Sequence, residues 1–418
     1  MEAAKIIAAL ARRVRDVGVA EELAQEALVA ALEQWPREGV PENGAAWLMT
    51  AAKRRAVDWI RREKLAGRKQ EELAREREGR TDAMEEQMVA ALDDAFGDDL
   101  LRLIFTACHP VLSPEGRAAL TLRLLGGLTT DEIARAFLVP EPTIAQRIVR
   151  AKRALAEADV AFEVPRGAEL RERLGSVLEV IYLLFNEGYT ATAGDDWMRP
   201  GLCEEALRLG RILAELMPEE AEVHGLAALM EIQASRSGAR IGPGGEPVLL
   251  PQQNRARWDW VLVRRGLAAL ERAEAPGAAG GEAGARGVYT LQAAIAACHA
   301  RARTAEETDW GRIAALYAEL VAVVPSPVVE LNRAVAVGMA LGPAAGLEVV
   351  DALREEGVLT EYHLLPSARG DFLMKLGRFA EARVAFEEAA ALTRNARERG
   401  LLVERARTAA DAARAPIK

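Results

Sequence analysis

Hydrogen-bonding side chains gather on one face of a helix predicted around residue 147. The segment TTDEIARAFLVPEPTIAQRIVRAKR runs from Thr129 to Arg153, and helical spacing places four polar groups opposite Ile144 and Ile148. These groups are Thr143, Gln146, Arg147 and Arg150. Arginine can pair with O6 and N7 of guanine, glutamine with adenine, and threonine with either base. The combination predicts a face that reads base edges in the DNA major groove.

The apolar residues of the same segment predict a helix-turn-helix. They fall where two helices that cross at a turn need an inner set, at Ile133, Ala134, Phe137, Val139, Ile144 and Ile148. Thr129 and Glu132 predict a capping box at the first helix, and the fixed φ of Pro142 suits the start of the second. Leu138 stands in the turn where glycine is common, and Pro140 stands where a hydroxyl N-cap is frequent.

Two further bases, Lys152 and Arg153, close the predicted recognition helix. Both are suited to contacts with DNA phosphates. Both also suit a plain interaction with the negative C-terminal end of the helix dipole. The sequence leaves these two interpretations open.

A second basic segment lies between Trp47 and Lys69, where bases outnumber acids. Helical spacing projects a ridge of four bases from it, Lys53, Arg54, Arg61 and Arg62. Beside Trp47 and Trp59, this ridge suits a single nucleic-acid strand held by charge and base stacking. Trp47 also fits the alternative interpretation of a core residue. Asn43, in the loop before the helix, is a candidate for contact with a flipped base.

Composition predicts an all-α protein of several domains. At 418 residues the chain is too long for one ordinary core. Apolar residues make up 50 % of it and aromatic residues only 5 %, and almost every segment has helical period. A net charge of −9 argues against a nucleic-acid partner, but the two basic segments stand out on an acidic background. Charge distribution therefore keeps nucleic acid as a partner.

Several functional classes find no support in the sequence. No phosphate-binding glycine loop, G-x-S-x-G or H-E-x-x-H motif is present, so neither an enzyme nor a cofactor is predicted. No signal peptide or apolar membrane span is recognisable, and the scattered Cys108, Cys203 and Cys298 favour a reduced cytoplasmic protein. His109 and His299 each follow a cysteine, but adjacent helical residues point apart, so no metal site is predicted.

Four parts are predicted along the chain: a small helical domain, a charged linker, a helix-turn-helix domain and a helical-repeat domain, at residues 1–65, 66–87, 88–160 and 168–418. The repeat prediction comes from Arg369–Leu392, which follows the tetratricopeptide pattern, with weaker relatives at Glu204–Gln233 and Arg312–Leu341. Leu376 is expected to pack at the turn of that repeat beside Gly377. One face is expected to hold Phe379, Ala382, Phe386 and Ala390. A generic helical bundle is the alternative.

The first 156 residues, taken together, resemble a sigma factor of the sigma-70 family. The resemblance is to the compact extracytoplasmic-function group, which keeps only the second and fourth conserved regions. VPEPTIAQRIVRAKR resembles its recognition helix for the −35 promoter element, and the segment Glu42–Lys64 resembles the one that melts and reads the −10 element. AEELAQEALVAALEQW, at Ala20–Trp35, resembles the helix that docks on the β′ clamp helices of RNA polymerase.

This resemblance implies two partners, promoter DNA and core RNA polymerase, the latter contacted through its β′ clamp helices and β flap. In the docking helix an inward stripe is expected at Leu23, Ala27, Leu28, Ala31 and Leu32. Outside the stripe lie the candidates for polymerase contact, Glu22, Gln25 and Glu26; a solvated helix face is the alternative. A one-component regulator with the repeats as sensor, and a repeat scaffold tethered to DNA, are the rival functions.

One subgroup of the family resembles this chain throughout, with a tetratricopeptide-like domain fused to the sigma regions. The resemblance implies that this domain regulates the sigma factor. Polar and aromatic residues suited to a regulatory groove for a protein or small molecule are Asn186, Glu187, Tyr189, Arg236, Arg240, Gln253, Arg255 and Trp258. The alternative is a long loop capped onto helices.

Overall fold

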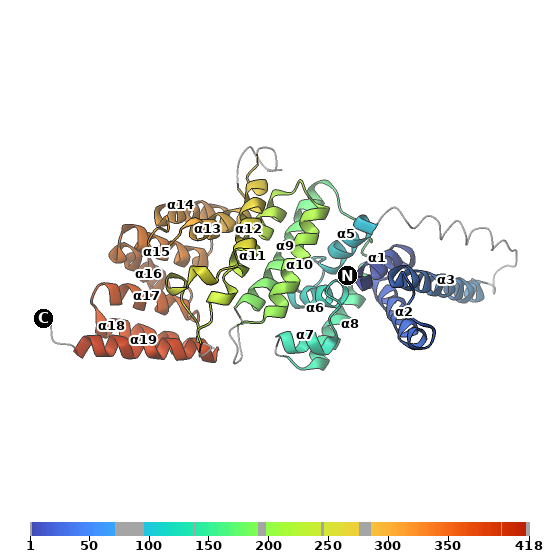
Figure 1. Ribbon diagram of the computed structural model, residues 1–418, viewed down its shortest axis with the longest axis horizontal. Coiled ribbons are helices and arrows are strands. Elements are labelled where there is room, and N and C mark those ends of the chain that lie inside the picture. The colour runs from blue at the N-terminus through green and yellow to red at the C-terminus, as the bar shows by residue number, and fades with distance from the viewer. Residues whose placement is uncertain are drawn as a thin grey trace. The chain divides into compact units, whose positions relative to one another are not determined.

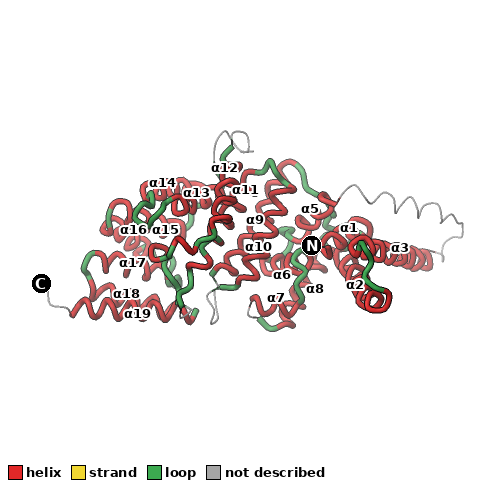
Figure 2. Tube along the Cα trace, in the orientation of Figure 1, coloured by secondary structure: helices red, strands yellow, loops and turns green. Residues whose placement is uncertain are grey.

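The computed structural model describes residues 2–71, 96–137, 139–190, 198–243, 246–275, 286–393 and 395–414. Within these ranges the backbone is helical apart from loops and one isolated bridge between Ile241 and Pro247 (Figures 1 and 2). The predicted all-α fold is confirmed. The chain divides into two compact units, Met1–Ile181 and Tyr182–Lys418, called unit 1 and unit 2 below. The predicted linker lies largely outside the described residues.

Unit 1 begins with three helices, α1 (Glu2–Val14), α2 (Val17–Glu38) and α3 (Gly44–Glu71). The side chain of Asp16 starts α2 by accepting a 2.9 Å bond from the N–H of Val19. Helix α1 packs on both α2 and α3, and its Ile6 and Leu10 are buried at helical spacing. Apolar spacing thus makes α1 the centre of this half.

The second half of unit 1 contains α5 (Phe96–Ala107), α6 (Pro114–Leu124), α7 (Thr130–Phe137), α8 (Glu141–Glu157) and the beginning of α9 (Gly167–Tyr189). Ser113 caps α6 by accepting a 3.2 Å bond from the N–H of Gly116. The capping box is formed as predicted: the N–H of Thr129 donates to Glu132 at 2.7 Å, and the N–H of Glu132 to Thr129 Oγ1 at 3.2 Å. Local sequence therefore fixes where α6 and α7 begin.

The first part of α9 closes the core of this second half. Ser176 donates to the carbonyl of Cys108 at 2.6 Å and accepts a bond from the guanidinium of Arg117. Arg173 lies 5.8 Å from the ring of Phe105. Arg117 and Arg173 are only 8 % and 5 % exposed, so removal of their partners would leave buried cations without compensation. Residues 167–181 are thus an integral part of unit 1.

Unit 2 is a succession of helices, with a long segment that contains the short 3-10 helices Ser237–Ala239, Leu250–Gln252 and Arg255–Arg257 between α11 and α12. Its helices after α9 are α10 (Pro200–Leu216), α11 (Ala221–Ala234), α12 (Trp260–Ala273), α13 (Val288–Arg301), α14 (Trp310–Val323), α15 (Pro327–Leu341), α16 (Pro343–Glu355), α17 (Leu364–Lys375), α18 (Phe379–Leu392) and α19 (Ala396–Arg414). From α13 to α19 each helix packs on the next. Packing in chain order is what a helical repeat predicts, while the tetratricopeptide assignment stays a prediction.

The best repeat coincides with the pair α17 and α18. Ala382, Phe386 and Ala390 are buried, and a Cβ at Gly370 would lie 2.6 Å from the Phe386 ring, so the two helices cross closely. The expected packing of Leu376 at the turn is wrong, because this side chain is 37 % exposed. Helix α17 has ended by then, and Gly377 at φ +73° reverses the chain, which leaves Leu376 at the rim.

Candidate promoter-binding surface

Helices α7 and α8 form the predicted helix-turn-helix in unit 1. Ile133 and Ile144 are fully buried between them, and Ala134 is 4 % exposed where the helices cross. The turn is held by a 3.1 Å bond from the N–H of Val139 to the carbonyl of Ala134. Pro140 precedes α8 without a side-chain cap, as expected. Leu138, the unusual turn residue, lies outside the described residues.

The face of α8 opposite Ile144 is open to solvent. Gln146 and Arg150 are exposed, whereas Thr143 and Arg147 are half-buried. Among the described residues, no carboxylate pairs with Arg147 or Arg150. The N–H groups of both guanidinium groups can therefore donate to an outside acceptor. Bidentate recognition of a base requires such donors.

Lys152 and Arg153, the two bases that close α8, have different environments. Arg153 is 77 % exposed at its side chain and pairs with Glu157 one turn later, at 2.6 Å. Lys152 is 23 % exposed, and its Nζ lies 2.6 Å from Glu21 on α2. The arrangement holds Lys152 against the first half of unit 1 instead of toward solvent.

Glu21 is the centre of a buried charge cluster that joins the two halves of unit 1. Its side chain is 6 % exposed, and its Oε1 lies 2.6 Å from Nε of Arg123 on α6. Gln25 donates to the same oxygen at 2.8 Å. We call Glu21, Gln25, Arg123 and Lys152 the Glu21 clasp. Sequence reasoning missed Glu21, although helical spacing puts it on the apolar side of α2 with Ala24, a signal for a buried carboxylate with partners.

The second basic segment lies on α3. Arg54, Arg61 and Arg62 are exposed and Lys53 is half-buried, so the predicted ridge is accessible. Trp47 packs edge to face on Trp35, with ring centroids 5.7 Å apart. Trp47 is half-buried, so its burial favours neither of the two interpretations, a nucleic-acid contact or a core residue, over the other.

Asn43 is exposed and has a local structural role at the start of α3. Its Oδ1 accepts a 3.0 Å bond from the N–H of Ala46. This is the geometry of a helix N-cap, which an asparagine provides well. Because Asn43 as a whole is exposed, the cap is compatible with the predicted contact to a base.

The outward face of α2 carries the predicted polymerase contacts. Glu22, Gln25 and Glu26 are exposed, and Glu26 lies 3.6 Å from Nε of Arg55 on α3. The inward stripe was wrong at Leu32, which is 75 % exposed, and Val29 is 52 % exposed. Seven residues make almost two helical turns, so Leu32 falls on the same side as Gln25. The outward face therefore carries polar side chains up to Glu26 and then two exposed apolar side chains, Val29 and Leu32, before α2 ends at Glu38.

Residues of the predicted regulatory groove lie in unit 2 and are mostly occupied with one another. The guanidinium of Arg240 lies 3.5 Å from the ring centroid of Tyr189, and burial lowers its pKa to about 10. Arg255 lies 4.6 Å from the ring centroid of the buried Trp258 and donates to the carbonyl of Ala302 at 3.0 Å.

The remaining groove residues follow the same pattern. Gln253 donates to the carbonyl of Val248 at 3.1 Å, and Glu187 pairs with Arg199. Asn186 is exposed. These contacts are those of a loop held against helices; Arg236 differs because it lines a cavity.

The cysteines are placed as ordinary thiols. Burial raises the pKa of Cys108 to about 11 and that of Cys203 to about 12. In the described part of the chain, no group of three or more His, Cys, Asp or Glu side chains is arranged to hold a metal ion. None of the described helices combines the length and the apolar character needed to span a membrane.

Comparison with protein families assigns three segments. Residues 2–65 match Sigma-70 region 2, residues 102–155 match Sigma-70 region 4, and residues 173–274 match a family of unknown function, DUF6596. The first two matches cover α1 to α3 and α5 to α8, which carry the two basic surfaces.

Similar proteins divide into two kinds. An uncharacterized protein of Rhizobium meliloti is 43 % identical over 395 residues, which cover 93 % of this chain and 90 % of that protein. The ECF RNA polymerase sigma factor SigK of Mycobacterium tuberculosis is 34 % identical over 148 residues, 34 % of this chain and 74 % of SigK. SigK of Mycobacterium ulcerans is 32 % identical over 155 residues, 36 % of this chain and 78 % of SigK. On these matches, the chain belongs to the extracytoplasmic-function sigma factors of the sigma-70 family.

Proposed function

We propose that this sigma factor binds core RNA polymerase through α2 and directs it to promoters read by α3 and α8, under control of unit 2. The observation that carries the proposal is the open face of α8. Gln146, Arg147 and Arg150 present base-reading groups there, with no carboxylate among the described residues to hold the two arginines.

The −35 element is read by α8 in the major groove. Arg147 and Arg150 are three residues apart and so address neighbouring base pairs from one helix face. Thr143, near the N-terminus of α8, supports them, and Arg153 is exposed enough to approach a phosphate. Direct pairs to bases supply specificity, and contacts to phosphates fix the register of the helix.

Strand separation at the −10 element falls to α3 and the residue before it. The bases Arg54, Arg61 and Arg62 follow the strand by charge, which is independent of sequence. The half-buried Trp47 is the ring proposed to stack on a base, and the amide of Asn43 is proposed to hydrogen-bond to a flipped base. The proposed site thus combines the charge of three arginines on α3 with base contacts from Trp47 and Asn43.

Core polymerase binding rests on the outward face of α2. Glu22 and Glu26 give this face negative charge, and Val29 and Leu32 add exposed apolar surface one and two turns later. An apolar patch rimmed by charge is typical of a protein interface. We assign this face to the β′ clamp helices and the second half of unit 1 to the β flap.

Regulation is assigned to unit 2. The Rhizobium meliloti relative matches over 93 % of this chain, so the sigma regions and unit 2 occur together in both proteins. Helices that pack in chain order expose long surfaces to partners, as helical-repeat proteins do. These observations favour a fused regulatory module.

Binding to genomic DNA fragments tests the proposal. Fragments are retained on the tagged full chain, on core polymerase, or on both together, and then sequenced. We expect a specific set only when both are present. A specific set retained by the full chain alone would support the one-component regulator, and no set under any condition would overturn both functions.

A further inference from the structure

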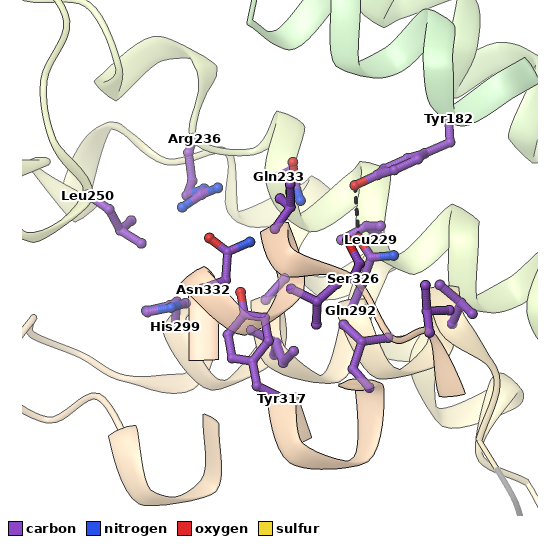
Figure 3. A pocket seen from close by; sticks show the side chains of 17 residues that line it. Tyr182, Leu229, Gln233, Arg236, Leu250, Gln292, His299, Tyr317, Ser326 and Asn332 are labelled. Carbon is purple, nitrogen blue, oxygen red and sulfur yellow. Dashed lines mark hydrogen bonds between the residues drawn. The ribbon is translucent and has the colours of Figure 1, made fainter. Parts of the chain in front are cut away.

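A cavity of about 410 Å³ opens among α11, α13, α14 and α15 of unit 2 (Figure 3). Its volume lies in the range of small-molecule sites in proteins. Apolar side chains form much of its wall, including Ile295, Leu320, Val324 and Val329. The family match of unknown function covers α11 but ends at residue 274, before α13, α14 and α15, and the sigma regions lie in the other unit.

Polar groups in the cavity wall are largely without protein partners. Tyr182 donates to Gln292 at 2.9 Å, and this pair is satisfied. Among the described residues, the side chains of Gln233 and Asn332 have no hydrogen-bond partner. Nε of Arg236 is buried and likewise has no partner in the described part of the chain. Asn332 is exposed and Gln233 is half-buried, so both can bond to water. A buried polar atom is normally bonded within the protein, so Nε of Arg236 is the group that favours an outside ligand.

The charge of the cavity is positive. The lining residues include one arginine, Arg236, and no lysine or acidic side chain. Burial, followed by the charges of Arg236 and Arg255, lowers the pKa of His299 to about 4. Burial raises the pKa of Tyr317 to about 12. The imidazole is therefore neutral and the phenol keeps its proton. An anion in the cavity would meet no negatively charged side chain among the lining residues.

We propose that this cavity binds a small amphipathic anion, whose acid group pairs with Arg236 and whose apolar body lies against Ile295, Leu320 and Val329. In Figure 3, Arg236 lies on the same side of the cavity as His299 and Asn332, and the Tyr182–Gln292 pair lies on the other side. The acid group thus meets the guanidinium and the Asn332 amide. Aromatic rings of Tyr182 and Tyr317 flank the apolar body.

This inference deepens the proposed regulation by unit 2: its meaning for transcription rests on the proposed function, but the binding itself does not. A ligand that contacts Arg236 from the α11 end and Asn332 from α15 would tie together helices distant in the chain order. Binding would then stabilise unit 2 in proportion to ligand concentration. Ligand binding and transcription are measured separately, so the failure of one is distinguishable from the failure of the other.

The test uses two fluorescent probes of nearly the same shape, anilinonaphthalene sulfonate and its uncharged analogue phenylnaphthylamine. Full chain is titrated with each probe. We expect saturable binding of one sulfonate probe per chain, with at least ten-fold higher affinity than for the uncharged analogue. A charge-assisted hydrogen bond is worth about ten- to hundred-fold in affinity.

Three variants locate the site. Arg236→Met is expected to weaken sulfonate binding about ten- to hundred-fold and to leave phenylnaphthylamine binding unchanged. Arg264→Met, at an exposed arginine of α12 that does not line the cavity, is the matched control and should change neither. Ala296→Phe fills the cavity and should abolish binding of both probes, with circular dichroism to verify that the helices are retained.

Several outcomes would overturn the proposal. Equal affinity for the two probes would mean an apolar pocket with no preference for anions. Unchanged sulfonate binding in Arg236→Met, or retained binding in a folded Ala296→Phe variant, would place the probe elsewhere. Absence of saturable binding by the wild-type chain would exclude the site for ligands of this size.

Discussion

Replacement of Glu21 by glutamine is the sharpest perturbation of unit 1. The amide keeps the shape of the side chain and removes its charge, so Arg123 and Lys152 both lose their carboxylate at 2.6 Å. The Glu21 clasp is one of the contacts between the half that carries α2 and the half that carries α8, beside the packing of α1 on α5. The change therefore loosens that contact without creating a cavity.

The magnitude follows from burial. Loss of one partner of a fully buried ion pair costs about 3–5 kcal/mol. Arg123 and Lys152 are 21 % and 23 % exposed and can recover part of their hydration, so we expect a loss of about 2–3 kcal/mol. For a unit of this size, that loss lowers the unfolding midpoint by about 4–12 °C.

Hydrogen exchange of the full chain measures the effect locally. We expect faster exchange in α2, α6 and α8 of Glu21→Gln and no change in unit 2. Glu22→Gln, at the exposed neighbouring position, is the matched control and should behave as wild type. Equal exchange and equal unfolding midpoints for the two variants would refute the energetic role of the clasp.

The Glu21→Gln variant also tests whether Lys152 contacts a DNA phosphate. In the wild-type structure its ammonium group is engaged by Glu21, so a phosphate contact requires the clasp to open. Glu21→Gln removes that cost, and binding to promoter DNA should strengthen, with a salt dependence steeper by about 0.9 in the log–log slope for one added phosphate contact. Unchanged affinity and slope would mean that Lys152 serves only as the partner of Glu21.

Three further predictions address the other surfaces. Arg147→Ala should cost about 1–3 kcal/mol in −35-dependent transcription and relax base preference at one position. Arg153→Ala should weaken transcription from all promoter sequences uniformly. Transcription from a library of promoter sequences would show the difference. Leu32→Asp should reduce core polymerase binding in a pull-down at least ten-fold. Val40→Asp, at a similarly exposed valine beyond α2, is the control and should not reduce it. Equal effects of the two variants would exclude the exposed Leu32 as a polymerase contact. A chain truncated after residue 165 should aggregate and one truncated after residue 181 should stay soluble, since the first part of α9 closes unit 1. Size-exclusion chromatography measures both, and a soluble chain of 165 residues would contradict the prediction.

Local signals in the sequence predicted the start of α7 and the buried side of the helix-turn-helix well. Thr129 and Glu132 cap α7 because the residues that make the box are three positions apart. The buried set at Ile133, Ile144 and Ile148 follows from helical period alone. In such cases the physical cause lies within a few residues, so a single sequence contains it.

Long-range contacts were not predictable in the same way. The clasp joins Glu21 to Arg123 and Lys152, residues far apart in the chain, and no local pattern names such partners. Leu32 was placed inside because its type suits a core, but it lies on the outward side of α2 with Gln25 and is 75 % exposed. The cavity in unit 2 likewise draws on α9, α11, α13, α14 and α15, and only Arg236 of the predicted groove lines it.

Promoter-specific initiation tests the central claim most directly. Genomic DNA of the source organism is transcribed by core polymerase with and without the full chain, and the 5′ ends of the RNA are sequenced. We predict start sites that appear only with the full chain and that share two upstream sequence blocks, with base preference relaxed at one position of the distal block in Arg147→Ala. Identical start sites with and without the chain would contradict its assignment as a promoter-reading sigma factor.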